Sequence, residues 1–435
     1  MEALARLARQ SGTFGARLQY RGDPSHRGGI FFRLYMQAEA PKQDIGSGET
    51  LKFIGHGCRM LITTVIAGSL LLAGSPGKLH AAPKPFAYSD GGRTYVPLRL
   101  LGEYAGAQVE WQQETGRIVL RKEGNEIVLR VGASEASVGG EAKPLDAPPI
   151  ALDGVTYVPL RFAGTELGLA IEWQQETNAV RVVRRDGEIR LPVVPLGSIR
   201  TDVSPIVHET RTFKVEGKSF KAQVITISLM DPRVELDVVP AGGRIGRTEA
   251  LDGIAKRHGA TVAINGAFFD AYTESDTKMP YGWIMNDGEV LNKGSGELRA
   301  TFIYDRNNLA EIADGGDMPA LIDAGGIDGA IQAGPRLVRN GAVELDVEGE
   351  RFRDPKILVN SGARSALGIT RDHRLILLTV PAATIPQLAE IMLQAGAWQA
   401  MNLDGGASSG LYYDGKYVTT PGRLLSNALI VKLED

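Results

Sequence analysis

The stretch Met401–Gly410 gathers residue types that could carry chemistry at one point of the chain. An apolar run ends there at an acid, two glycines and two serines. If the run is a strand, Asn402 and Asp404 lie at a sheet rim, where glycine lets backbone or a ligand come close. A tight Asp-Gly hairpin turn explains the same pattern without any chemistry. Other parts of the chain must therefore decide between the two interpretations.

A second unit of the same kind stands earlier in the chain. In both units a predicted helix ends at a glycine, and a short apolar strand then delivers an asparagine. The first unit covers residues 248–265 and delivers Asn265, and the second covers residues 386–402 and delivers Asn402. We expect both asparagines to meet at one rim of one sheet.

Composition excludes several classes of function. The chain has 435 residues and a net charge of −3, which gives no electrostatic reason to expect a nucleic-acid partner. Its one cysteine, Cys58, cannot form a disulfide or a cysteine metal site within the chain. No HExxH, GxSxG or Walker motif occurs, which argues against zinc peptidases, α/β-hydrolases and P-loop enzymes. The isolated His373 sits in a predicted turn, where we expect it to be solvated.

Residues 1–82 are interpreted as a disordered extension followed by a signal peptide or an anchor. The apolar run of residues 60–74 is short for a membrane span and suits a signal sequence, with Ala81 and Ala82 as a cleavage site. We expect a secreted or cell-wall-associated protein, or a membrane-anchored one if cleavage does not occur.

Residues 84–190 contain an internal repeat. Thr94-Tyr-Val-Pro-Leu-Arg99 and Trp111-Gln-Gln-Glu-Thr115 both recur 62 residues later. Each copy predicts a glycine turn, a short strand ending at proline, a helix and further strands, with the helices over residues 98–104 and 160–167. The repeated aromatic residues are Tyr95, Trp111, Tyr157 and Trp173. They could form a row on which sugars stack, but aromatic residues at fixed positions of a repeat more often belong to the core.

This repeat resembles the copper amine oxidase N-terminal-like domain. No histidine falls between residues 81 and 190, so nothing suggests a copper ligand. The resemblance implies a stalk or wall-facing module in contact with the cell wall. Residues 191–205 predict a semi-extended linker.

Residues 206–435 predict a separate domain. Residues 220–229 and 233–239 alternate between apolar and polar side chains, as half-buried strands do. We expect an α+β fold with a mixed, largely antiparallel sheet and a few helices, preceded by the two small α+β repeats.

Four motifs of this domain, in this order, resemble the phosphodiester glycosidase family: Asn265-Gly-x-Phe-Phe269, Gly334-Pro-x-Leu337, Arg364-x-Ala-x-Gly368 and Asn402-Leu-Asp-Gly-Gly-x-Ser408. The resemblance covers most of residues 220–433, and its last motif is the most specific. Ala407 stands where the family commonly has a third glycine, and the loop of residues 270–281 differs, which leaves substrate choice open.

The resemblance implies hydrolysis of a sugar joined through its anomeric oxygen to a phosphodiester. Asp404 is then the candidate nucleophile or base, and Arg364 the candidate phosphate ligand; a structural ion pair of Arg364 is the alternative. Asn265 completes the catalytic candidates. Asn402, Gly405, Gly406, Ser408, Asp270 and Gly334 are the candidate substrate-binding residues, with Asp270 either a second carboxylate or a cap of its loop.

We expect no cofactor and no metal-ligand cluster, with calcium left open because oxygen ligands need no short motif. The expected substrate is a sugar-1-phosphodiester of an envelope glycan, such as an N-acetylglucosamine-1-phosphodiester. Two alternatives remain: a non-catalytic glycan-binding surface protein, and a phosphodiesterase that cuts the P–O bond.

Overall fold

The computed structural model describes residues 84–434, apart from residues 113, 185–186 and 295–297. The predicted extension and signal sequence, residues 1–82, lie outside the described residues. The described residues belong to one compact unit. Among the helices described, none has the length and apolar character needed to cross a membrane.

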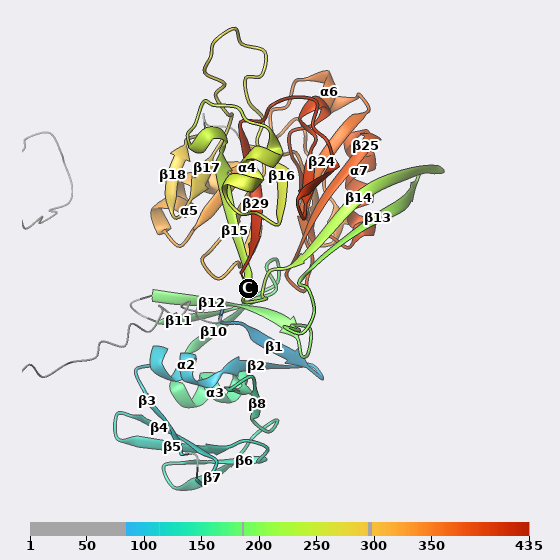
Figure 1. Cartoon of the computed structure of the whole chain (residues 1–435). Helices are drawn as coiled ribbons and strands as arrows, with labels where there is room; N and C mark the ends of the chain where they lie inside the picture. Colours follow the sequence, from blue (N-terminus) through green and yellow to red (C-terminus); the bar gives the residue numbers. More distant parts are fainter. Residues whose placement is uncertain (1–83, 113, 185–186, 295–297, 435) are drawn as a thin grey trace, which may run out of the picture. The chain divides into compact units, whose positions relative to one another are not determined.

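The repeat region folds into two sheets with two short helices (Figure 1). Helices α2 (Leu98–Tyr104) and α3 (Leu160–Leu167) have the predicted bounds. One sheet has the order β10 (Ala170–Gln174), β11 (Ala179–Arg184), β12 (Gly187–Pro195), β1 (Ala87–Asp90), β2 (Arg93–Pro97), β9 (Val155–Pro159) and β8 (Ile150–Leu152). The other has the order β3 (Gln108–Gln112), β4 (Arg117–Lys122), β5 (Asn125–Arg130), β6 (Glu135–Val138) and β7 (Glu141–Pro144).

The predicted linker is in part a strand. Residues 191–195 belong to β12, which pairs antiparallel with β11 and parallel with β1. The apolar side chains of this segment are buried, Leu191 and Val194 among them. Pro192 and Pro195 favoured the linker prediction, but Val193 and Val194 between them are packed in the core, so the segment belongs to the strand.

The C-terminal region has three sheets. The largest has the order β13 (Ile206–Val215), β14 (Lys218–Ser228), β25 (Arg374–Ala383), β24 (Gly362–Ile369), β26 (Gln399–Asn402), β22 (Arg336–Arg339) and β23 (Ala342–Val343). The second has the order β15 (Val234–Pro240), β29 (Asn427–Leu433), β16 (Val262–Asn265), β27 (Leu411–Tyr413) and β28 (Lys416–Thr419). The third has the order β18 (Glu289–Asn292), β17 (Ile284–Asn286), β21 (Gly329–Gln332), β19 (Thr301–Tyr304) and β20 (Ala310–Ala313).

Helices cover the outer faces of these sheets. They are α4 (Leu251–Arg257), α5 (Met318–Ala324), α6 (Pro355–Leu358) and α7 (Ile385–Ala395). Helix α7 begins with a capping box, in which Thr384 and Gln387 satisfy each other's backbone N–H, and it ends at Gly396 in the left-handed conformation. Its apolar face packs against the seven-stranded sheet. The strand pairs of this region are antiparallel, so the predicted α+β, largely antiparallel fold is confirmed.

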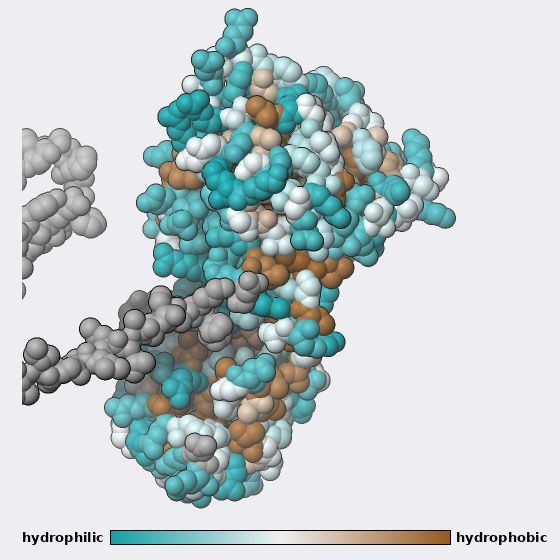
Figure 2. All heavy atoms as spheres, viewed as in Figure 1, coloured by the Kyte–Doolittle hydropathy of each residue, from teal (hydrophilic) through white to brown (hydrophobic). Residues whose placement is uncertain are grey.

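The repeated aromatic residues separate into two groups. Tyr95 and Tyr157 are core residues, as predicted, each with 6% of its surface exposed. The core prediction is wrong for Trp111 and Trp173, which are 45% and 48% exposed. Each shares a strand face with a residue that packs against the core, Val109 or Ile171, but lies two positions further along the strand, where the indole stays exposed. In Figure 2 the brown, hydrophobic residues gather mainly over the repeat region, whereas the surface of the C-terminal region is mostly hydrophilic.

His373 is buried rather than solvated, with 2% of its surface exposed. Its Nε2 lies 3.1 Å from the carbonyl oxygen of Asn178 in the repeat region. Burial disfavours the imidazolium and lowers the pKa of His373 to about 4. The ring is therefore neutral in the native protein at neutral pH and acts as a packing and hydrogen-bonding residue.

This burial predicts a pH-dependent stability. Between the ordinary histidine pKa of about 6.5 and the native pKa of about 4, the unfolded chain binds a proton that the native chain does not. The free energy of unfolding should thus fall as pH is lowered through this window, by on the order of 3 kcal/mol. Denaturant unfolding at pH 7.5 and pH 4.5 measures it, and His373→Gln should remove this share. Equal pH slopes for both proteins would contradict the prediction.

Candidate active site

Two strand ends meet at the site, although they belong to different sheets. Strand β16 ends at Asn265 in one five-stranded sheet, and β26 ends at Asn402 in the seven-stranded sheet. The expectation of one shared rim is therefore wrong. The ends are joined instead by hydrogen bonds between sheets, among them Asp404 N–H to the carbonyl of Gly266 at 3.0 Å.

The side chain of Asn265 holds this junction together. Its Nδ2 donates to the carbonyl of Asp404 at 2.6 Å. Its Oδ1 accepts from the hydroxyl of Ser365 at 2.6 Å and from the N–H of Gly410 at 3.0 Å. The residue is 1% exposed, and its amide is occupied by the protein itself. Asn265 therefore positions the loop of residues 404–410, and it is not among the residues that line the cavity described below.

Asn402 and Gly334 form a second internal contact. Asn402 is fully buried, and its Nδ2 donates to the carbonyl of Gly334 at 2.9 Å. A Cβ atom on Gly334 would lie 2.4 Å from Oε2 of the buried Glu350, so only glycine fits there. Neither residue lines the cavity described below. The structure therefore brings these two predicted substrate ligands together, but behind the site.

A cavity of about 610 Å³ opens beside the loop that follows β26. Seven charged side chains are among its lining residues, namely Asp270, Arg299, Asp354, Lys356, Arg364, Asp404 and Arg423. Four of these are cations and three are carboxylates, a balance that suits an anionic ligand. Gly405 and Gly406 also line it, so Arg364, Asp404 and both glycines share one cavity as the sequence predicted.

Asp404 is the carboxylate with the most strongly altered environment in this cavity. Its Oδ1 accepts from the N–H of Gly405 at 2.9 Å, and the side chain of the buried Ser408 also hydrogen-bonds to it. Burial nevertheless dominates and raises the pKa of Asp404 to about 6. The charges of Arg423 and Lys356 oppose this rise. A carboxyl group tuned in this way suits proton transfer or nucleophilic attack near neutral pH.

Arg364 is held by the backbone rather than by an acid. Its Nε donates to the carbonyl of Ala383 at 2.9 Å, and its Nη2 donates to the carbonyls of Lys356 and Asn360 at 2.6 and 2.7 Å. Burial lowers the pKa of its guanidinium, which stays charged. The Nη1 atom lies 3.7 Å from the point where a Cβ of Gly405 would be. Arg364 thus lines the cavity as a fixed cation with 3% of its surface exposed, and no ion pair in the described residues neutralises it.

Three residues at the mouth of the cavity carry no motif and were missed by the sequence analysis. The side chain of Tyr272 is 77% exposed, and its hydroxyl accepts from Nη2 of Arg423 at 2.9 Å. Arg423 also lies over the Tyr272 ring at 4.9 Å, and Nζ of Lys356 lies 5.4 Å from the same ring. The hydrogen bond from Arg423 and both positive charges lower the pKa of Tyr272. No sequence signal marks this cluster, because its members come from two separate loops and the short helix α6.

The other carboxylates of the cavity have structural partners. Asp270 accepts from the N–H of Thr273 at 3.2 Å, the loop cap that was its alternative interpretation, while it also lines the cavity. Asp354 caps α6 by accepting from the N–H of Lys356 at 2.9 Å. Across residues 84–434, with the gaps given above, no three carboxylate, histidine or cysteine side chains come together as a metal site. The prediction that no cofactor takes part, with calcium left open, stays a prediction.

Two family models match separate parts of the chain. Residues 258–432 match the phosphodiester glycosidase model, and residues 76–182 match the copper amine oxidase N-terminal domain model. The first range includes Asn265, Arg364 and Asp404, and the second includes both repeat copies.

A curated relative and two solved structures are similar to parts of the chain. Mouse N-acetylglucosamine-1-phosphodiester alpha-N-acetylglucosaminidase is 25% identical over 231 residues, which are 48% of this chain and 44% of that protein. The chain thus spans less than half the length of this relative.

A hypothetical protein from Synechocystis covers 80% of this chain and 99% of its own, with 16% identity and a TM-score of 0.43. The catalytic domain of the zebrafish N-acetylglucosamine-1-phosphodiester alpha-N-acetylglucosaminidase covers 55% and 86%, with 18% identity and a TM-score of 0.45. On the two family matches, the chain carries a phosphodiester glycosidase domain preceded by a copper amine oxidase N-terminal domain.

Proposed function

We propose that the protein hydrolyses a sugar-1-phosphodiester in the cavity that contains Asp404. The observation that carries the proposal is the placement of one carboxyl group, with a pKa near 6, among four cations within the matched glycosidase region. A sugar-1-phosphodiester carries one negative charge on its phosphate, close to the anomeric carbon that reacts. The cavity has cations that can pair with the phosphate and one carboxyl group that can act at the anomeric carbon.

The cations would bind the phosphate. Arg364 is fixed by three carbonyl contacts, so its guanidinium needs no reorganisation when an anion arrives. Lys356 and Arg423 approach from the mouth, where they hold Tyr272 between them. The leaving group would be a phosphate monoester, whose negative charge grows as the bond breaks. Positive charge aimed at that group stabilises the transition state more than the ground state.

Asp404 would act at the anomeric carbon, either as the nucleophile or as the base that activates water. In the reaction, the bond between the anomeric carbon and its oxygen breaks, that oxygen leaves with the phosphate, and the oxygen of water ends on the sugar. Asn265 and Ser408 would hold Asp404 in place through the loop and the carboxylate. We extend the proposal to a secreted or wall-associated enzyme acting on an envelope glycan, as the sequence predicts.

Replacing Asp404 tests its role. Asp404→Asn should lower kcat by about 10²–10⁴. In the wild type, kcat/KM should rise with pH through about 6 and level off above, because the reactive form is the ionised carboxylate. Lys356→Ala removes a charge that lowers this pKa and should move the midpoint to higher pH. Steady-state kinetics on a panel of sugar-1-phosphodiesters, from pH 4.5 to pH 8.5, measures both effects.

Stability supplies the control for this experiment. Because burial penalises the charged carboxylate, Asp404→Asn should be at least as stable as the wild type at pH 8. A folded Asp404→Asn protein with wild-type kcat would refute the assigned role.

Hydrolysis in oxygen-18 water distinguishes a glycosidase from a phosphodiesterase. We expect the label in the released sugar, since the bond to the anomeric carbon breaks, and none in the phosphate monoester. Mass spectrometry of both products measures it. Label in the phosphate would show cleavage of the P–O bond, and binding without any product would favour the glycan-binding alternative.

A further inference from the structure

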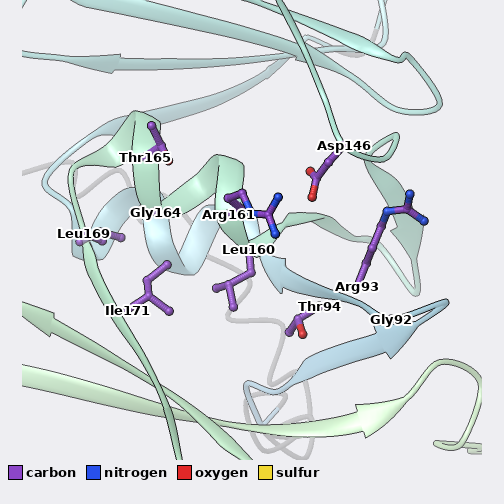
Figure 3. A pocket seen from close by; sticks show the side chains of 10 residues that line it. All are labelled: Gly92, Arg93, Thr94, Asp146, Leu160, Arg161, Gly164, Thr165, Leu169 and Ile171. Atoms are coloured by element: carbon purple, nitrogen blue, oxygen red, sulfur yellow. The ribbon is translucent and has the colours of Figure 1, made fainter.

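The repeat region contains two grooves that its internal repeat relates to each other. Groove 1, of about 470 Å³, is lined by the turn of residues 92–94 from the first copy and by α3 and β10 residues from the second (Figure 3). Groove 2, of about 420 Å³, is lined by residues 154–156 from the second copy and by α2 and β3 residues from the first. In each groove, the glycine turn of one copy therefore lies across from the helix of the other copy.

The strand register explains this exchange. Strands β2 and β9 pair antiparallel, with Tyr95 opposite Pro159, Val96 opposite Val158 and Pro97 opposite Tyr157. A shift of 62 residues turns the first pair into the third and leaves the middle pair unchanged. The two copies are therefore related by a local twofold axis at Val96 and Val158, and any groove between them occurs twice.

Groove 1 has a polar side and an apolar side. Figure 3 shows Arg93, Arg161 and Asp146 gathered at one side and Leu169 and Ile171 at the other. The side chain of Arg161 is exposed and has no hydrogen-bond or ion-pair partner among the described residues. Groove 1 is therefore lined by two arginines and one aspartate, a net charge of +1, next to the aliphatic side chains of Leu169 and Ile171.

Groove 2 repeats this chemistry with an aromatic wall. Arg99, the counterpart of Arg161, is exposed and likewise unpartnered within the described part of the chain. It is the one charged residue among those lining the groove. Trp111 forms part of the wall, two residues beyond Val109 on the same face of β3. Trp173 has the same relation to Ile171 on β10: it lies on the strand face that carries Ile171, next to groove 1 in sequence but outside the set of residues that line it.

Glycine at a third repeated position lets the helices form these floors. A Cβ atom on Gly102 would lie 2.6 Å from Val109, and one on Gly164 would lie 2.4 Å from Ile171. The helices can therefore lie directly against the strands that carry the tryptophans. The tryptophans themselves are 45% and 48% exposed. Two equivalent positions of the repeat thus leave a large apolar side chain in contact with solvent, which is unfavourable unless a ligand covers it.

We propose that the two grooves bind an anionic polysaccharide, a function beyond the hydrolytic one and independent of it. A pyranose ring has an apolar face of C–H groups that stacks on an indole, while its hydroxyls stay in water. An acidic substituent on the same sugar would pair with Arg99 or Arg161. An acidic polypeptide would satisfy the arginines, but it offers no saccharide face to the tryptophans.

A polymer fits better than a single sugar because the sites are paired. Once one groove holds a chain, the other engages a second stretch of it at high effective concentration, so two weak sites give a much tighter complex. This arrangement would keep the hydrolase domain on a polymer that carries many substrate bonds.

Binding of the full-length protein to immobilised alginate, an acidic polysaccharide, tests the proposal by biolayer interferometry. The neutral polysaccharide dextran and the acidic polypeptide poly-L-glutamate are the comparison ligands. The variants are Trp111→Ala with Trp173→Ala, Arg99→Ala with Arg161→Ala, and each groove altered alone. Arg117→Ala with Arg130→Ala, two exposed arginines of the same region outside both grooves, is the matched control.

We expect alginate to bind more tightly than either comparison ligand. Each double groove variant should weaken alginate binding by at least about tenfold, and altering one groove should already remove the gain from pairing. The control variant should bind like the wild type, and all variants should hydrolyse small diesters normally. Wild-type binding by the groove variants would overturn the proposal. Equal binding to dextran would refute the role of charge, and equal binding to poly-L-glutamate would refute recognition of sugar.

Discussion

The carboxamide of Asn265 is the contact on which the candidate site depends. It stands at the end of β16, and it binds the carbonyl of Asp404, the hydroxyl of Ser365 and the N–H of Gly410, which belong to the seven-stranded sheet or the loop that leaves it. A single buried side chain thus ties two separate sheets together. It fixes both ends of the glycine-rich loop of residues 404–410, so Asp404 is held in one position at the cavity.

Charge in the cavity follows from the same construction. Asp404 is buried enough for its pKa to rise to about 6, while the two cations that oppose this rise, Arg423 and Lys356, come from a loop and from helix α6. Arg364 lines the same cavity, where backbone carbonyls hold it and no acid neutralises it within the described residues. The result is a carboxyl group and an anion site side by side. Direct ion pairing between them would have cancelled both.

Much of the fold could be predicted from the sequence, because its local signals agree with the final packing. Proline before each repeated helix and glycine after it set the bounds of α2 and α3, and the capping pattern set α7. The shared cavity of Arg364 and Asp404 also followed from the motifs. The roles of Asn265 and Asn402 did not, since an amide donates and accepts equally well towards protein and ligand.

Other residues could not be placed because their roles depend on tertiary packing alone. A repeat fixes where Trp111 and Trp173 stand but not whether their strand face is covered. His373 lies in a turn that the repeat region happens to bury, through Asn178. Tyr272, Lys356 and Arg423 converge from two loops and the short helix α6, and such convergence leaves no periodic signal in the sequence.

A crystal structure of the Asp404→Asn protein with a non-hydrolysable sugar-1-phosphonate ester would show where phosphate and sugar bind. We expect phosphonate oxygens within hydrogen-bonding distance of Arg364, Lys356 or Arg423, and the anomeric carbon next to the side chain of residue 404. A ligand bound with its phosphonate away from these cations, or its anomeric carbon far from residue 404, would contradict the proposed roles of Asp404 and the cations.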